Sequence, residues 1–198
     1  MIPFLPLQQI NHRYEPALSA AIQRVVDSGW YLLGKEVERF EHDFAAYVGT
    51  SHCVGVANGL DALTLALMAM KDYFGWETEA QVIVPNMTFV ATAEAVVRAG
   101  LVPVFAEVDD SALLTVEAVD AVYTPRVRAV IPVHLYGKMA PMPALKAWAD
   151  AHKNNCCKMR HRHMVLHAKV SKLVRGESWR HSVFILEKIL AHWATVVR

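Results

Sequence analysis

The sequence predicts an α/β protein built on a doubly wound, mostly parallel sheet. Apolar segments of strand length alternate with amphipathic segments of helix length between residues 15 and 136. The strand-length segments are apolar almost throughout rather than at every second residue, which is typical of strands that helices cover on both faces. With 198 residues, of which 54% are hydrophobic, the chain can bury a sizeable core.

Two amphipathic helices are expected first. Residues 15–28 carry apolar side chains at helical spacing and are followed by Gly29, a common helix stop. Residues 35–47 place Phe40 and Phe44 one helical turn apart on the same side. Both helices therefore have one face to bury.

Strands and helices then alternate. Strands are expected over residues 52–57, 81–85, 101–108 and 129–136. Helices are expected over residues 60–73, over residues 88–99 with Gly100 as the stop, and around residues 146–153. This order is that of an open sheet with helical crossovers.

Charge divides the chain into two parts. The net charge of +1 argues against a generally basic nucleic-acid binder, but the last 46 residues hold ten Lys and Arg against two Glu. We therefore expect an α/β unit over residues 1–152 and a basic tail over residues 153–198.

The three cysteines form no disulfide framework, the first residues lack the basic start of a signal peptide, and no apolar run reaches the roughly 20 residues of a membrane span. We expect a cytoplasmic protein without membrane partners.

The segment from Thr50 to Leu63 predicts an anion site. An apolar strand breaks at Asn58-Gly59 into a helix whose first turn carries only one charge, Asp61. Backbone N–H groups at a helix N-terminus have no partner within the helix, so a tight glycine turn there can hold a phosphate. The same pattern also occurs as a plain connection between a strand and a helix.

Five ordered motifs resemble one enzyme family. They are Ser-Gly-Trp-Tyr-Leu-Leu-Gly at 28–34, Glu41, Val-Ala-Asn-Gly-Leu-Asp-Ala-Leu at 56–63, Val-Pro-Asn-Met-Thr-Phe at 84–89 and Pro-Val-His-Leu-Tyr-Gly at 132–137. The chain resembles the N-terminal part of the DegT/StrS sugar aminotransferases, most of all the branch that aminates dTDP-3-keto-6-deoxyhexoses. The resemblance implies pyridoxal phosphate (PLP) as cofactor and an incomplete aspartate-aminotransferase-like (PLP fold type I) large domain. In that fold, three strands that come later in sequence separate the strand at 52–57 from the other strands.

The resemblance assigns three cofactor-binding residues. Gly59 and Leu60 are the backbone donors to the cofactor phosphate, and the family often has threonine or serine in place of Leu60. Phe89 matches the aromatic residue that stacks on the pyridine ring, because a flat ring covers a flat heterocycle and excludes water. Without the motif, Phe89 reads equally as an ordinary core residue.

Four further residues are expected to bind substrate. His134 and Tyr136 lie at the carboxyl end of a predicted strand, where open α/β sheets bind ligands. Trp30 and Tyr31 lie in the loop that approaches the sugar and the partner subunit in the family. Structural roles stay open for His134 as a satisfied histidine, and for Trp30 and Tyr31 as a surface cluster. The family also implies a nucleotide-sugar substrate, glutamate as amino donor and a homodimer, in amino-sugar synthesis for surface polysaccharide or lipopolysaccharide.

No catalytic residue is assigned. Such an enzyme needs a lysine to form the Schiff base with the cofactor and a carboxylate to hold the pyridine nitrogen protonated. The family carries the carboxylate in a strand just after the helix at 146–153 and the lysine in a later Ser-Phe-Tyr-Pro-x-Lys-Asn-Leu-Gly segment. From Asn154 this chain departs from both motifs, and no acid follows until Glu177.

A shift of reading frame is our hypothesis for this departure. If each codon's third base is read with the first two bases of the next codon, residues 158–166 are compatible with Asp-Ala-Ala-Gln-Ala-His-Gly-Ala. Residues 182–198 are likewise compatible with Ser-Phe-Tyr-Pro-Gly-Lys-Asn-Leu-Gly and its continuation. We therefore expect a frame slip near residues 155–158, a tail that is not natively folded, and a truncated, inactive version of the enzyme.

Three other interpretations stay open. The chain could be a non-catalytic module that binds the cofactor or the sugar. The tail's cysteines and histidines could bind zinc, although adjacent cysteines do not match the usual ligand spacing, and its basic excess could bind nucleic acid. We expect neither a metal nor a nucleic-acid partner. The cysteines and histidines in question are Cys156, Cys157, His161, His163 and His167.

Overall fold

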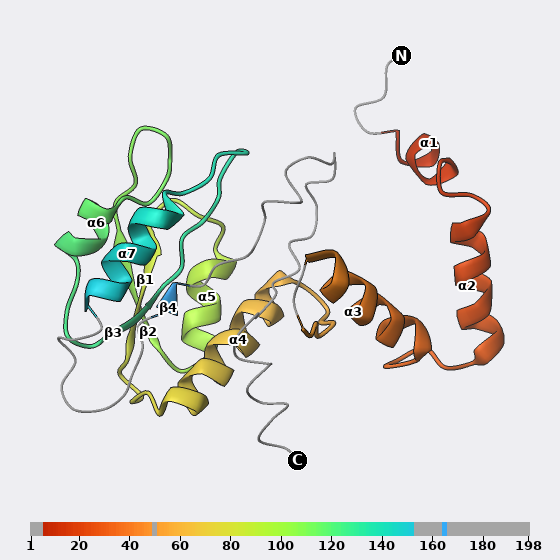
Figure 1. Cartoon of the computed structure of the whole chain (residues 1–198), viewed down its shortest axis with the longest axis horizontal. Helices are drawn as coiled ribbons and strands as arrows, with labels where there is room; N and C mark the ends of the chain where they lie inside the picture. The colour runs from red at the N-terminus through yellow and green to blue at the C-terminus, as the bar shows by residue number, and fades with distance from the viewer. Residues whose placement is uncertain (1–5, 49–50, 153–163, 166–198) are drawn as a thin grey trace.

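A parallel sheet forms the centre of the protein. The computed structural model describes residues 6–48, 51–152 and 164–165 (Figure 1). The sheet has four strands in the order β2-β1-β3-β4, all paired in parallel. The strands are β1 (Gln81–Pro85), β2 (Val102–Ala106), β3 (Val127–Val130) and β4 (Met164–Val165).

Helices cover both faces of this sheet. The described helices are α1 (Leu7–His12), α2 (Ala17–Ser28), α3 (Lys35–Val48), α4 (Gly59–Phe74), α5 (Ala91–Arg98), α6 (Val116–Ala121) and α7 (Met142–His152). Side chains of α4 and α5 share one core cluster with the sheet, and side chains of α6 and α7 share a second cluster with its other face. The predicted doubly wound α/β fold is confirmed, as part of a fold type I large domain.

Strand β1 joins the two clusters. Its Val82 and Val84 belong to the cluster under α4 and α5, whereas Ile83 belongs to the cluster under α6 and α7. All three side chains are fully buried, as expected for a central strand of a parallel sheet. Strand β2 lies at the edge and contains Pro103, a residue that edge strands tolerate.

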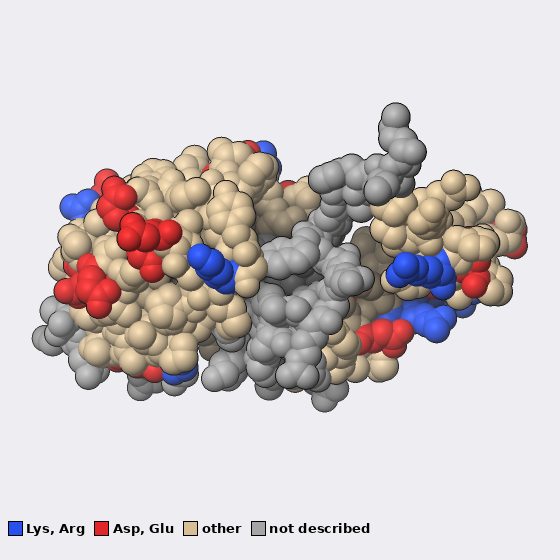
Figure 2. Space-filling view, turned by 90° about the horizontal axis from the view of Figure 1, so that it is seen from above, with Lys and Arg blue, Asp and Glu red and all other residues tan. Residues whose placement is uncertain are grey.

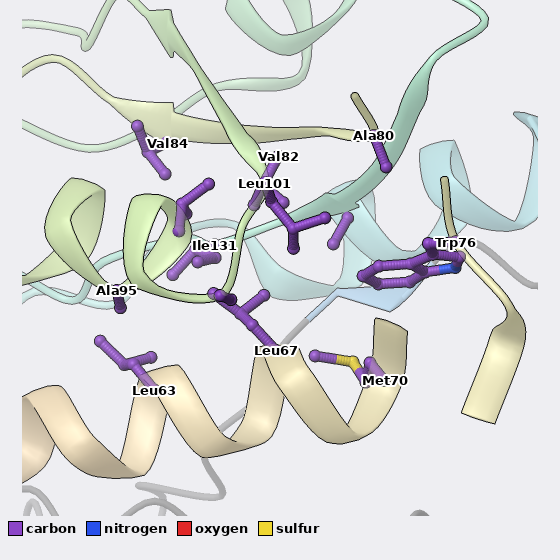
Figure 3. Close-up of a cluster of buried hydrophobic side chains, with 13 residues drawn as sticks. Leu63, Leu67, Met70, Trp76, Ala80, Val82, Val84, Ala95, Leu101 and Ile131 are labelled. Carbon is purple, nitrogen blue, oxygen red and sulfur yellow. The ribbon is translucent and has the colours of Figure 1, made fainter. Parts of the chain in front are cut away.

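Helix α4 runs opposite to β1. In Figure 3, Leu63 of α4 lies at the end of the cluster that holds Val84, and Met70 lies at the end that holds Ala80. The side chains of α4 that face the sheet recur at helical spacing, which is why this segment forms an amphipathic helix. The N-terminus of α4 therefore lies at the carboxyl end of β1.

Lys71 ties α4 to α5. Its Nζ donates hydrogen bonds to the carbonyl oxygens of Ala99 at 3.2 Å and Gly100 at 3.0 Å, where α5 has just ended. A cation is favourable at a helix C-terminus because the last carbonyl groups lack partners within the helix. Gly100 has a φ of +67°, which makes a glycine necessary at this close approach.

Helices α1, α2 and α3 form an arm that extends away from the sheet (Figure 1). No side chain of α1 or α2 is buried. Arg24 of α2 and Glu36 of α3 form an exposed ion pair with two hydrogen bonds, at 2.8 Å and 3.3 Å. The guanidinium of Arg24 lowers the pKa of the Glu36 carboxyl, chiefly by hydrogen bonding. The predicted helices at 15–28 and 35–47 are confirmed.

The prediction of a strand at 52–57 is wrong. The structure has no helix or strand over residues 51–57, although the helix predicted after it is present as α4. A strand is stable only beside a neighbour that accepts its backbone hydrogen bonds. An apolar pattern alone does not supply that neighbour.

Other element boundaries differ from the sequence prediction. Helix α5 starts at Ala91 instead of residue 88, and β2 is shorter than the predicted 101–108. Strand β3 ends at Val130, so residues 131–136 form a loop; Pro132 lacks the N–H group that would continue the ladder. Helices α1 and α6 were not predicted. The strand at 81–85 has the predicted bounds.

Of the predicted tail, the structure describes only β4. Met164 pairs with Ala129 and Val165 with Val130 of β3. The tail's other residues, including the cysteines and histidines considered for zinc, lie outside the described residues. The division at residue 152 and the tail's lack of native folding remain predictions.

The described surface carries mixed charges. Figure 2 shows acidic side chains gathered over the sheet and its helices, with basic side chains lying singly or in small groups among the described residues. A broad basic patch of the kind that binds nucleic acid is not seen on this face. None of the helices within the described ranges combines the length and apolar character of a membrane span.

Replacement of Leu67 by alanine tests the packing of α4. Leu67 is 0% exposed in the cluster against β1, so Leu67→Ala should lower the free energy of unfolding by about 2–5 kcal/mol through lost burial and a cavity. Leu65, on the same helix, is 50% exposed, and Leu65→Ala should change it by less than about 1 kcal/mol. Urea unfolding followed by tryptophan fluorescence measures both. Equal losses in the two variants would contradict this packing.

Candidate functional site

The turn before α4 presents backbone donors. Asn58 has an extended backbone and caps the helix, its Oδ1 accepting the N–H of Asp61 at 2.9 Å. Its Nδ2 in turn donates to Oδ2 of Asp61 at 2.9 Å. This reciprocal pair satisfies the third N–H of the helix and holds the turn in one conformation.

Gly59 and Leu60 supply the first two N–H groups of α4. Within the described residues, no hydrogen bond reaches either group, and both point outward at the positive end of the helix dipole. The Leu60 side chain packs against the core cluster, so this residue offers a ligand only its backbone. Two adjacent amides at a helix N-terminus fit the phosphate of PLP.

Phe89 follows β1 at the same end of the sheet. It lies in the loop between β1 and α5, and its side chain is 76% exposed. The alternative of Phe89 as a core residue is therefore excluded. Thr88 bonds Thr92 through their hydroxyl groups at 2.8 Å, which fixes the start of α5 beside Phe89. An exposed aromatic ring on a fixed loop can stack on a flat heterocycle.

Asn86 and Glu107 also lie at this edge. Asn86 Nδ2 donates to Glu107 Oε2 at 2.5 Å and thereby connects the ends of β1 and β2. Sequence reasoning did not single out either residue. The signal that could have found Asn86 is position, since it directly follows the predicted strand at 81–85 at the ligand-binding edge. Glu107 lay inside the predicted strand at 101–108 and follows a strand only in the structure, where β2 ends at Ala106.

His134 closes the loop after β3. Its Nδ1 accepts the N–H of Ala140 at 3.1 Å, so the proton of the neutral ring is on Nε2. Tyr136, within this loop, is 76% exposed and has a φ of +51°, a left-handed conformation that is uncommon for a bulky residue. The bond from Ala140 supports the structural role considered for His134, and the loop presents Tyr136 to solvent.

The structure places five of the seven predicted site residues at one edge of the sheet. The N-terminus of α4, the loop after β1 and the loop after β3 all lie at the carboxyl end of the parallel strands, which carries Gly59, Leu60, Phe89, His134 and Tyr136. Trp30 and Tyr31 lie instead between α2 and α3 in the arm, away from the sheet. There the Trp30 indole donates to the carbonyl of Leu32 at 2.6 Å.

The lysines among the described residues are bonded to other groups or lie on the surface. Lys35 begins α3, Lys71 bonds carbonyl groups beyond α5, Lys138 is exposed in the loop after β3, and Lys146 pairs with Asp150 at 2.6 Å on α7. The described residues thus fit the phosphate and the ring face of PLP. They place no lysine in a buried pocket at this edge. Within the same residues, no three His, Cys, Asp or Glu side chains gather to hold a metal ion.

The comparisons with known proteins agree with this geometry. The model of the DegT/DnrJ/EryC1/StrS aminotransferase family matches residues 13–155. The chain belongs to this family. A transaminase of Aneurinibacillus thermoaerophilus, dTDP-3-amino-3,6-dideoxy-alpha-D-galactopyranose transaminase, is 44% identical over 146 residues, which are 73% of this chain and 39% of the relative.

Solved structures of the family share the fold. DesV of S. venezuelae has a TM-score of 0.68 and 43% identity, covering 76% of this chain and 40% of DesV. NtdA of Bacillus subtilis, whose structure holds the cofactor PMP, has a TM-score of 0.67 and 28% identity, covering 77% of this chain and 34% of NtdA. PLP is therefore the cofactor of the family. The chain spans about two fifths of the length of the relatives it matches.

Replacement of Asn58 tests the cap of α4. Asn58→Ala removes the acceptor of the Asp61 N–H and should lower the free energy of unfolding by about 1 kcal/mol. Asn58→Ser keeps a neutral acceptor without placing a second carboxylate beside Asp61, and should lose much less. Hydrogen exchange of the Asp61 amide should accelerate in the alanine variant alone. Unchanged exchange in Asn58→Ala would show that the side chain does not cap the helix.

Proposed function

We propose that residues 1–152 are the cofactor-phosphate and ring-binding part of a PLP-dependent aminotransferase for a nucleotide-linked keto-deoxysugar. The observation that carries the proposal is the pair of outward amides at Gly59 and Leu60, held at the sheet edge that also presents Phe89. The amides bind the phosphate, and the Phe89 ring covers the pyridine and excludes water. Bound PLP supplies the electron sink of the reaction.

The same proposal gives the substrate side of the site. His134 holds the loop of Tyr136, and the exposed Tyr136 side chain is the proposed substrate contact at this edge. Trp30 and Tyr31 reach the sugar through the arm in an assembled homodimer. Glutamate is the amino donor, and the location is cytoplasmic. The dTDP-sugar named for the 44% identical relative supports a dTDP-linked hexose as the first substrate to test.

Under this proposal, the 198-residue chain with its present tail has no transaminase activity. Proton transfer at the substrate carbon needs a lysine beside the cofactor, and the described lysines are engaged elsewhere or lie on the outside. The change of reading frame near residues 155–158 removes the codons of that lysine and of the pyridine carboxylate. They would straddle residues 187–188 and 158–159, respectively.

A second candidate function is a non-catalytic module that binds PLP or the sugar nucleotide. The presence of the phosphate and ring-face residues in the described part favours it, because binding needs these residues and chemistry needs the lysine as well. The two functions differ in one measurement. Binding without amino-group transfer by the chain with a restored frame supports the module.

Replacement of Phe89 tests the stacking role. In the full chain, Phe89→Ala should weaken PLP binding by about 1–3 kcal/mol, because the ring loses its apolar cover. Phe105→Ala removes another exposed phenylalanine, on edge strand β2, and should leave binding unchanged. Equilibrium dialysis at several PLP concentrations measures both affinities. An equal loss in both variants would remove Phe89 from the site.

Restoring the reading frame tests the proposed function as a whole. Sequencing of the nucleotides around codon 155 should locate the slip, and a one-base shift there should give a longer chain that transfers the amino group of glutamate to a dTDP-linked keto sugar. The unshifted chain should give no product above background. An early stop codon in the shifted frame would contradict the frame-slip hypothesis, and a restored chain that does not bind PLP would contradict the proposed function of residues 1–152.

A further inference from the structure

The Gly59 and Leu60 amides at the start of α4 form the proposed phosphate-binding site, called the cradle below. The segment before this turn lacks regular structure. Residues 51–57 belong to no helix or strand of the described protein, yet they lead directly into Asn58 and the amides of Gly59 and Leu60. An irregular segment samples many backbone conformations unless specific contacts hold it. The position of the cradle therefore depends on the contacts that hold this segment.

Glu41 of α3 makes such a contact. Its Oε1 accepts the backbone N–H of Gly55 at 2.6 Å, and both residues are half-buried. A hydrogen bond to an ionised carboxylate is shorter and stronger than one between neutral groups, and partial burial protects it from competition by water. This bond joins the arm to the segment that ends in the cradle.

Gly55 is shaped for this contact. A Cβ atom at Gly55 would lie 3.3 Å from Oε1 of Glu41 and 3.5 Å from Cγ1 of Val37. The first distance is tighter than an ordinary van der Waals contact, so a side chain at this position would push the carboxylate away from the N–H. The glycine at position 55 therefore allows the close approach of the Glu41 carboxylate, and its role is not simply to make the segment flexible.

The pKa of the Cys53 thiol depends on the charge of the same carboxylate. Burial raises the pKa of the Cys53 thiol, and the negative charge of Glu41 raises it further. The thiol is itself half-buried, two residues before Gly55. Its reactivity can be measured independently of any ligand.

We propose that Glu41 is the positioning residue of the phosphate cradle, fixing Gly55 so that the short connection 56–58 holds the amides of Gly59 and Leu60 in place. Three residues span at most about 10 Å, so anchoring Gly55 restricts where Asn58 can lie. That the anion is the phosphate of PLP rests on the proposed function. The positional role of Glu41 does not.

Hydrogen exchange of the full chain tests the positioning. In Glu41→Ala, exchange of the Gly55 amide and of the capped Asp61 amide should accelerate about tenfold, while amides of β1 keep their protection. Glu41→Gln keeps an acceptor oxygen and should restore most of the protection. Glu38→Ala, an exposed glutamate on the same helix, should match the wild type. Faster exchange at Gly55 with an unchanged Asp61 amide would overturn the proposal.

Alkylation of Cys53, followed by peptide mass spectrometry, separates charge from hydrogen bonding. The midpoint pH of alkylation should fall in both Glu41→Gln and Glu41→Ala, because both remove the charge that raises the thiol pKa. Only Glu41→Ala should lose the Gly55 protection. If Glu41→Ala unfolds, Gly55→Ala provides the second variant, and it should accelerate exchange at Asp61 while β1 stays protected. An unchanged midpoint in Glu41→Gln would contradict the contact.

PLP binding then connects the two proposals. By equilibrium dialysis, Glu41→Ala should bind PLP about tenfold more weakly than the wild type, and Glu41→Gln should bind within about twofold of it. If the wild-type chain does not bind PLP, the proposed function fails and the exchange data alone decide the role of Glu41. Wild-type affinity in Glu41→Ala would show that the anchor does not serve the cradle.

Discussion

The burial of β1 between two helical layers determines where every candidate residue lies. Val82 and Val84 pack under α4 and α5, and Ile83 packs under α6 and α7, so a shift of the strand by one residue would move each side chain to the opposite face and disrupt both clusters. Because α4 runs opposite to β1, its first turn comes level with the loop that carries Phe89. The same packing thus places the two outward amides of Gly59 and Leu60 and the aromatic ring of Phe89 at one edge.

Sequence reasoning predicted this core well because it reads burial. The continuous apolar segment at 81–85 and the helical spacing in α4 both reflect side chains that leave water. It failed at residues 52–57, where an equally apolar pattern has no strand, because strand formation depends on a neighbour's backbone and not on the segment itself. It also extended β3 through Pro132, where loop geometry replaces the ladder.

The candidate site shows the same division. Gly59, Leu60 and Phe89 could be proposed from sequence because their motif contains a tight turn before a helix and an aromatic residue after a strand, and the structure places both at one edge of the sheet. Asn86 and Glu107 were not, since their bond joins two loops that only the sheet register brings together. For His134, predicted to bind substrate with a structural role left open, the structure adds a bond in which its Nδ1 accepts a backbone N–H inside its own loop. Contacts of this kind follow from tertiary structure.

The bond from Lys71 to the carbonyl groups after α5 bears on how the polypeptide emerges during synthesis. Helix α4, strand β1 and helix α5 are consecutive in the chain. The bonds from Lys71 to Ala99 and Gly100 join the first of these elements to the end of the last. Contacts between residues that are near in sequence form early and fast. This unit can therefore assemble on the ribosome before residue 155 is translated, whichever frame is read afterwards. A change of frame would then leave a folded nucleus whose fate in the cell depends on the exposed apolar arm attached to it.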